Sequence, residues 1–101
     1  MSYTFKNIYT KPNAEVNINF WDEDGSKASA VNDLIDTYFD AGKITQKPTK
    51  SVDGLTETWT AVFKDKVSFD EFSNESASKS NLTNMSTYCT DNGIIFNMVE
   101  E

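Results

Sequence analysis

The stretch KITQKPTKSVDGLTETWTAVFKD, residues 43–65, carries the clearest signal of two strands joined by a turn. Residues 55–64 alternate apolar or large side chains with threonine, valine and lysine, and this period of two is typical of a half-buried strand. Asp53-Gly54 is a pair favoured in two-residue hairpin turns, where positive φ is needed at both positions. Residues 44–52 are the weaker arm, because their proline cannot donate to a central ladder. The stretch therefore predicts a β-hairpin with its first arm at a sheet edge.

The residues before the hairpin predict a helix and two strands. Residues 27–41 place one apolar stripe at helical spacing, and Gly42 suits the left-handed residue that closes a helix. The stripe consists of Val31, Leu34, Ile35, Tyr38 and Phe39. Residues 15–21 alternate as a strand that we expect near the sheet centre, and residues 2–9 predict a shorter extra strand.

The segment after the hairpin predicts two helices and a last strand. Ser68, followed three residues later by Glu71, matches a capping box, so we expect a helix to start there. One straight helix cannot continue to residue 90, because its apolar residues change face, and we infer a break within 78–81. Residues 94–99, IIFNMV, predict an apolar strand at the other sheet edge.

The order of these elements predicts a single α+β domain over residues 1–101. After an N-terminal strand extension at 1–13, residues 14–99 follow the order strand, helix, strand, strand, helix, strand. This order is typical of a ferredoxin-like βαββαβ sandwich, an antiparallel sheet with its helices on one face. Right-handed crossovers place the first core strand and the second hairpin arm at the centre. The apolar last strand needs a cover, which the N-terminal strand or a second subunit can supply.

The composition excludes several kinds of chemistry. The chain has no histidine, and all nine of its basic residues are lysine. There is therefore no Ser-His or Cys-His pair, no imidazole metal ligand and no arginine clamp for phosphate. A net charge of −7 argues against nucleic acid as a partner. Residues 43–66 hold five of the lysines, which makes the hairpin a mildly basic patch on an acidic protein.

Cysteine usage and the lack of long apolar runs predict a cytoplasmic protein. Cys89 is the only cysteine, so no internal disulfide can form, and we expect a buried, inert thiol. No run of about 18 apolar residues and no secretory-type start is present. The acidic string at 22–26 fails the spacing of a calcium loop, and we predict no metal or cofactor. Many asparagines and lysines without arginine are typical of AT-rich coding sequences, as in some bacteria and phages.

The hairpin, the helical stripe at 31–39 and the strands at 16–20 and 94–99 resemble, in order and size, the dimeric α+β barrel superfamily. It includes small cofactor-independent monooxygenases and barrel proteins of stress response and antibiotic biosynthesis. The resemblance is topological, covers residues 14–99 and rests on no active-site motif. It implies a homodimer that joins sheet faces or edges, and the thirteen aromatic residues indicate the same.

Three functions remain as hypotheses. The first is a self-associating domain without catalytic residues that binds a protein partner or a small apolar ligand. The second is a small barrel-type enzyme that acts on an apolar or aromatic molecule, and the third is an acidic decoy that mimics nucleic acid. A cavity of several hundred Å³ with convergent polar groups would favour the enzyme, whereas a filled core would favour the other two. The candidate pocket residues are Trp59, Tyr38, Tyr88 and Asp22.

Overall fold

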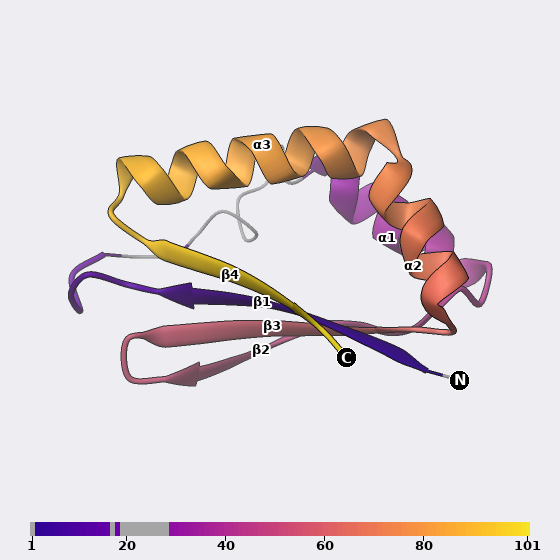
Figure 1. Cartoon of the computed structure of the whole chain (residues 1–101), viewed down its shortest axis with the longest axis horizontal. Helices are drawn as coiled ribbons and strands as arrows, with labels where there is room; N and C mark the ends of the chain where they lie inside the picture. Colours follow the sequence, from indigo (N-terminus) through magenta and orange to yellow (C-terminus); the bar gives the residue numbers. More distant parts are fainter. Residues whose placement is uncertain (1, 17, 19–28) are drawn as a thin grey trace.

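The computed structural model of the chain describes residues 2–16, 18 and 29–101. Within these residues the protein has an α+β structure with a four-stranded antiparallel sheet and three helices (Figure 1). The elements follow in the order β1 (Tyr3–Thr10), α1 (Ser29–Asp40), β2 (Ile44–Asp53), β3 (Thr56–Phe63), α2 (Lys66–Asn74), α3 (Ser76–Asp91) and β4 (Ile95–Glu100). None of these helices has the length and apolar character needed to cross a lipid bilayer.

The sheet has the strand order β2-β3-β1-β4. Its centre is formed by β1 and β3, which pair antiparallel with Asn7 opposite Trp59, and β1 also pairs with β4, with Asn7 opposite Met98. The predicted hairpin is confirmed, because β2 pairs antiparallel with β3. The edge positions predicted for residues 44–52 and 94–99 are confirmed as well. Because β1 takes the central place beside β4, it does not cover the outer edge of the last strand, which has no partner strand within the described residues.

The prediction of a central strand at residues 15–21 was wrong in its described part. Glu15, Val16 and Ile18 lie outside strands, and the rest of the predicted strand falls outside the described residues. The central place is taken by β1, which was expected only as an extension. The physical reason is that β1 matches β3 across the pair, because both strands alternate large side chains on the inner face with mostly threonine on the outer face.

The hairpin turn lies one residue later than predicted. Strand β2 ends at Asp53 and β3 begins at Thr56, so the two turn residues are Gly54 and Leu55. Gly54 has a φ of +60°, and no described residue other than glycine has positive φ. Glycine at the first turn position is the arrangement of a type II′ turn, which also matches the twist of the two strands.

All three helices cover the same face of the sheet (Figure 1). The predicted break after the hairpin exists, but it falls at Glu75, three residues before the predicted range, where the backbone is extended between α2 and α3. Gly42, with a φ of +78°, follows α1 as predicted.

Helix α2 begins earlier than the capping box predicted. Its N-cap is Asp65 and not Ser68, because the carboxylate of Asp65 accepts a hydrogen bond from the backbone N–H of Ser68 at 2.8 Å. This bond lowers the pKa of the Asp65 carboxyl. A carboxylate at a helix start is also favoured by the helix dipole.

The buried core lies between the helices and the inner face of the sheet, in two clusters. The first consists of Tyr9, Ile18, Val31, Met85, Cys89 and Ile94. The second consists of Tyr38, Ile44, Ala61, Phe63 and Phe69. Cys89 is a buried free thiol, as predicted, and burial raises its pKa.

Candidate ligand-binding cavity

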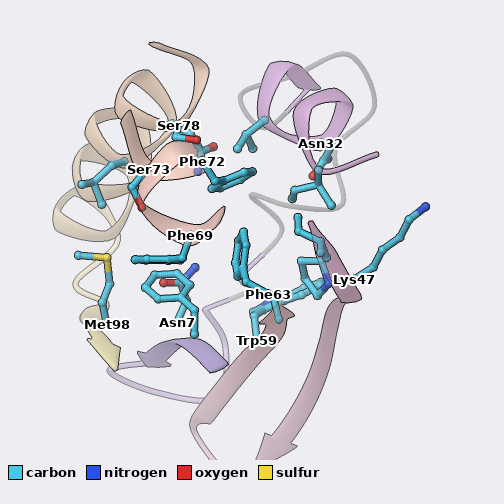
Figure 2. Close-up of a pocket in the computed structure, with 18 of the residues that line it drawn as sticks. Asn7, Asn32, Lys47, Trp59, Phe63, Phe69, Phe72, Ser73, Ser78 and Met98 are labelled. Carbon is cyan, nitrogen blue, oxygen red and sulfur yellow. The ribbon is translucent and has the colours of Figure 1, made fainter. Parts of the chain in front are cut away.

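A cavity of about 350 Å³ lies between the helices and the inner face of the sheet (Figure 2). Its volume falls within the range of small-molecule sites, roughly 300–1,000 Å³. The alternation of β3 directs Trp59, Ala61 and Phe63 into the cavity, and the alternation of β1 directs Phe5 and Asn7 into it. Helices α1, α2 and α3 supply the roof.

Aromatic rings form one continuous wall of the cavity. Phe69 and Phe72 are three residues apart on α2, so they share a helix face. Both pack edge-on against Phe63, at centroid distances of 5.2 Å and 5.3 Å, and Phe5 packs against Phe69 at 4.8 Å (Figure 2). Tilted and edge-on contacts of this kind fix the positions of rings. The wall is therefore apolar and its rings hold one another in place.

Part of the opening of the cavity lies where α3 and β4 separate. A short connection joins these two elements, and β4 then runs away from α3 (Figure 1). Leu82 on α3 and Met98 on β4 both line the cavity, and they are 39% and 49% exposed. Two exposed apolar side chains thus stand on opposite sides of the opening, which suits the entry of an apolar ligand.

Three residues of the cavity lining carry a buried polar atom that has no hydrogen-bond partner in the described part of the chain. The three atoms are Asn7 Oδ1, Ser78 Oγ and Asn81 Oδ1. Asn81 is only 7% exposed. Figure 2 shows Asn7 at the sheet side, below Phe69, and Ser78 at the helix side. An unsatisfied buried polar group costs about 1–3 kcal/mol, so three around one cavity need an explanation.

The ionisable side chains of the described lining lie at its rim. Asp36 and Lys47 are both exposed, and they pair with each other at 2.9 Å. The side chain of Lys47 points away from the cavity (Figure 2), and Lys79 is exposed on α3. Within the described residues, the interior therefore presents amides, two serine hydroxyls and apolar groups, but no ionised side chain.

Of the four candidate pocket residues, the cavity lining contains Trp59. Its indole N–H donates to Glu57 Oε2 at 2.8 Å, which fixes the orientation of the ring. Tyr88 packs against the first core cluster and is not part of the lining. Asp22 lies outside the described residues.

Tyr38 is buried, but it is not part of the cavity lining and instead forms a contact between helices. Its hydroxyl donates to Glu75 Oε2 at 3.0 Å, which connects α1 to the junction between α2 and α3. Burial, together with the bond to this carboxylate, raises the pKa of Tyr38 to about 12. A hydroxyl with this pKa keeps its proton at neutral pH and acts as a fixed donor.

Sequence reasoning missed Asn7, Ser78 and Asn81. Asn7 is the one polar member of the inward-facing row of β1, which otherwise holds Tyr3, Phe5 and Tyr9. Asn81 precedes Met85 and Cys89 by four and eight residues, so it belongs to the buried stripe of α3. A polar residue within an apolar row was the available signal.

Over residues 2–16, 18 and 29–101, no three or more cysteine, aspartate or glutamate side chains group together as metal ligands. Comparison of the chain with models of known families, with curated proteins and with solved structures finds no match. The geometry of the cavity is therefore the basis for inferring a function.

Proposed function

We propose that this protein binds a small, mostly apolar molecule in the cavity between its helices and its sheet. The observation that carries the proposal is the presence of three buried polar atoms without partners around an otherwise apolar cavity of about 350 Å³. A ligand that forms hydrogen bonds with these atoms avoids a cost of about 1–3 kcal/mol for each of them that a purely apolar occupant incurs. A few convergent polar groups in an apolar cavity are typical of ligand sites.

From the sequence, a cavity was expected for the enzyme and a filled core for the other two hypotheses. The cavity also fits the small-ligand form of the first hypothesis, whereas the acidic decoy needs no ligand. A cofactor-independent enzyme remains the second candidate, because convergent polar groups were its criterion. Binding without chemistry has the stronger support, since general acid or base catalysis needs an ionisable group near the substrate. The ionisable side chains of the described lining, Asp36, Lys47 and Lys79, are exposed at the rim.

The experiment that tests ligand binding compares two substitutions on neighbouring residues of β3. Ala61 is buried and lines the cavity, whereas Thr60 faces the other side of the sheet. We expect 2-methylnaphthalene to bind the wild-type protein with a Kd on the order of 0.1 mM, from ordinary ligand efficiencies. Ala61→Leu fills part of the cavity and weakens binding by about 10-fold, which corresponds to about 1.4 kcal/mol.

The control variant Thr60→Leu adds the same apolar bulk outside the cavity and leaves the Kd within about 2-fold. NMR titration of uniformly labelled protein measures all three constants. The proposal fails if the wild-type protein shows no saturable binding, or if Ala61→Leu binds as well as Thr60→Leu does.

We also assign the fold to the ferredoxin-like plan, with β1 rather than residues 15–21 as its first strand. In support, the elements from β1 to β4 follow the order strand, helix, strand, strand, two helices, strand. The sheet order β2-β3-β1-β4 has the first and third strands at the centre, as right-handed crossovers require. We likewise propose, on topology alone, that the chain resembles the dimeric α+β barrel superfamily.

For the assembly we propose a homodimer formed through the outer face of the sheet. The outward positions of β1, β3 and β4 carry threonine, isoleucine, valine, one asparagine and one lysine. The carboxylates beside them are Glu101, which pairs with this lysine at 3.4 Å, and Asp53 at the end of β2. In a chain of net charge −7, this is a face that two copies can join with little opposition of like charges. Ile8 stands in its middle, between Thr58 and Asn97.

Sedimentation at micromolar concentration tests the dimer. We expect the wild-type protein to sediment as a dimer and Ile8→Lys to sediment as a monomer with an unchanged circular dichroism spectrum. Val67→Lys, at an exposed apolar residue on α2, is the control and keeps the dimer. A monomeric wild-type protein contradicts this proposal and leaves the proposed ligand binding untouched.

A further inference from the structure

We infer that the ligand of this cavity is a flat, uncharged molecule with a hydrogen-bond donor, such as a ring hydroxyl or ring N–H, and that Asn7 and Asn81 recognise this donor. The inference rests on the proposed function and names the chemical class of the ligand. Three properties of the cavity support it: the acceptors it presents, the positions of its charges and the shape of its wall.

Around the cavity, the buried polar atoms that lack partners within the described residues mainly accept hydrogen bonds. Two of the three atoms without partners in the described part are amide oxygens, Asn7 Oδ1 and Asn81 Oδ1, and these only accept. The third, the hydroxyl of Ser78, adjusts to either role. A ligand without a donor leaves both amide oxygens unpaired after water has been displaced. A ligand with a donor pairs at least one of them.

Both amides are held by rigid elements. Asn7 lies on a strand that is paired on both sides, with Trp59 opposite in β3 and Met98 opposite in β4. Asn81 lies within the 16-residue helix α3, one turn before the buried Met85, and is itself 7% exposed. Acceptors carried on strands and helices are placed more precisely than acceptors on loops, which favours discrimination between ligands.

The charges of the lining exclude an ionised ligand. The described ionisable side chains stand at the rim, and Asp36 and Lys47 already pair with each other at 2.9 Å. A carboxylate placed inside meets neutral amides, hydroxyls and aromatic rings, with no cation in the described interior to compensate for its lost hydration. An ammonium group finds no described carboxylate in the interior. The ligand is therefore neutral.

The aromatic wall selects a flat shape. Phe63 and Phe69 are almost fully buried and meet edge to face, so neither ring can rotate to admit a bulky group. Trp59 lies across from Asn7 on the neighbouring strand, with its indole fixed by Glu57. A planar ring system placed along this wall has its donor within the region that Asn7 and Asn81 line.

The test uses three probes that share one ring system and differ in a single substituent. These are 2-naphthol, with a donor; 2-methylnaphthalene, of equal shape without one; and 2-naphthoate, which is ionised at neutral pH. Isothermal titration calorimetry or NMR titration gives their dissociation constants. We expect 2-naphthol to bind about 10- to 30-fold more tightly than 2-methylnaphthalene, and 2-naphthoate to bind most weakly.

The same titrations on variants of α3 assign the effect to Asn81. In Asn81→Leu the preference for 2-naphthol over 2-methylnaphthalene falls to about 3-fold or less. Asn84→Leu, an exposed position on the same helix, keeps the wild-type preference. If Asn81→Leu does not fold, the smaller change Asn7→Ala serves in its place and is expected to reduce the preference as well.

The outcomes distinguish failure of the proposed ligand class from failure of ligand binding itself. Equal binding of 2-naphthol and 2-methylnaphthalene overturns the donor assignment but leaves a binding cavity. Tightest binding of 2-naphthoate overturns the neutral-ligand assignment. The absence of saturable binding for all three probes overturns this inference together with the proposed function.

Discussion

Two neighbouring regions between β1 and α3 differ in how they are packed. At one level, which we term the filled end, Tyr9 is fully buried and its hydroxyl donates to Sδ of Met85, a residue that also borders the cavity. At the other level, the open end, Asn7 and Asn81 line the cavity, and neither amide oxygen has a partner in the described part of the chain. Asn7 is two residues from Tyr9, and Asn81 is one helical turn from Met85.

The difference teaches that packing stability and ligand binding are divided between the two ends. The filled end pairs its polar group and closes its volume, as native cores do. At the open end, leucine in place of either asparagine would satisfy the apolar surroundings better. Residues that reduce stability without an evident structural gain are expected at functional sites.

The largest expected effect is the difference in stability lost when a side chain is truncated at the filled end or at the open end. Tyr9→Ala removes the largest side chain of the filled end and is expected to lower the free energy of unfolding by about 3–5 kcal/mol. Leu82→Ala at the open end removes a side chain that is 39% exposed, and we expect a loss below about 1 kcal/mol. Urea denaturation measures both. Equal losses would mean that the open end is packed as closely as the filled end.

A smaller effect of opposite sign is expected from removing a polar group at the open end. Asn81→Leu replaces an amide whose oxygen lacks a partner in the described residues, and we expect it to raise the free energy of unfolding by about 1–2 kcal/mol. Asn84→Leu, the exposed control on α3, is expected to change it by less than about 0.5 kcal/mol. A clear loss of stability in Asn81→Leu would show that its amide has a structural role.

The smallest effect concerns α2, which covers the open end and is capped by Asp65. The folded-state pKa of Asp65 is lowered, so its contribution to stability is present above the unfolded pKa, about 3.9, and is lost as pH falls through the folded pKa. Asp65→Asn keeps a capping side chain without this titration. The melting temperature of the wild-type protein should therefore fall more steeply than that of Asp65→Asn between about pH 4 and pH 2. Parallel curves for the two proteins would contradict the assignment of the cap.

The hairpin, the helix α1 and both edge strands were predictable, because periodicity and turn residues act locally. The choice of the central strand was not. Residues 2–9 and 15–21 both alternate, and only the cross-strand pairing of β1 with β3 and β4 distinguishes them. Strand pairing over such a separation in the chain leaves no local signal.

The cavity was less accessible to sequence reasoning than the fold. The polar positions Asn7 and Asn81 are visible as interruptions of apolar rows, but their lack of partners depends on how far α3 stands from the sheet. In the same region β4 diverges from α3 along its length (Figure 1). Trp59 could be predicted as a pocket residue because it lies on β3, whose regular alternation was visible in the sequence.

The most direct test of the central claim observes the side-chain amides themselves by NMR during addition of 2-naphthol. The account predicts that the side-chain amide resonances of Asn7 and Asn81 shift in a saturable manner, while those of the exposed Asn84 and Asn97 stay in place. Equal shifts at all four asparagines, or unchanged resonances of Asn7 and Asn81, would contradict it.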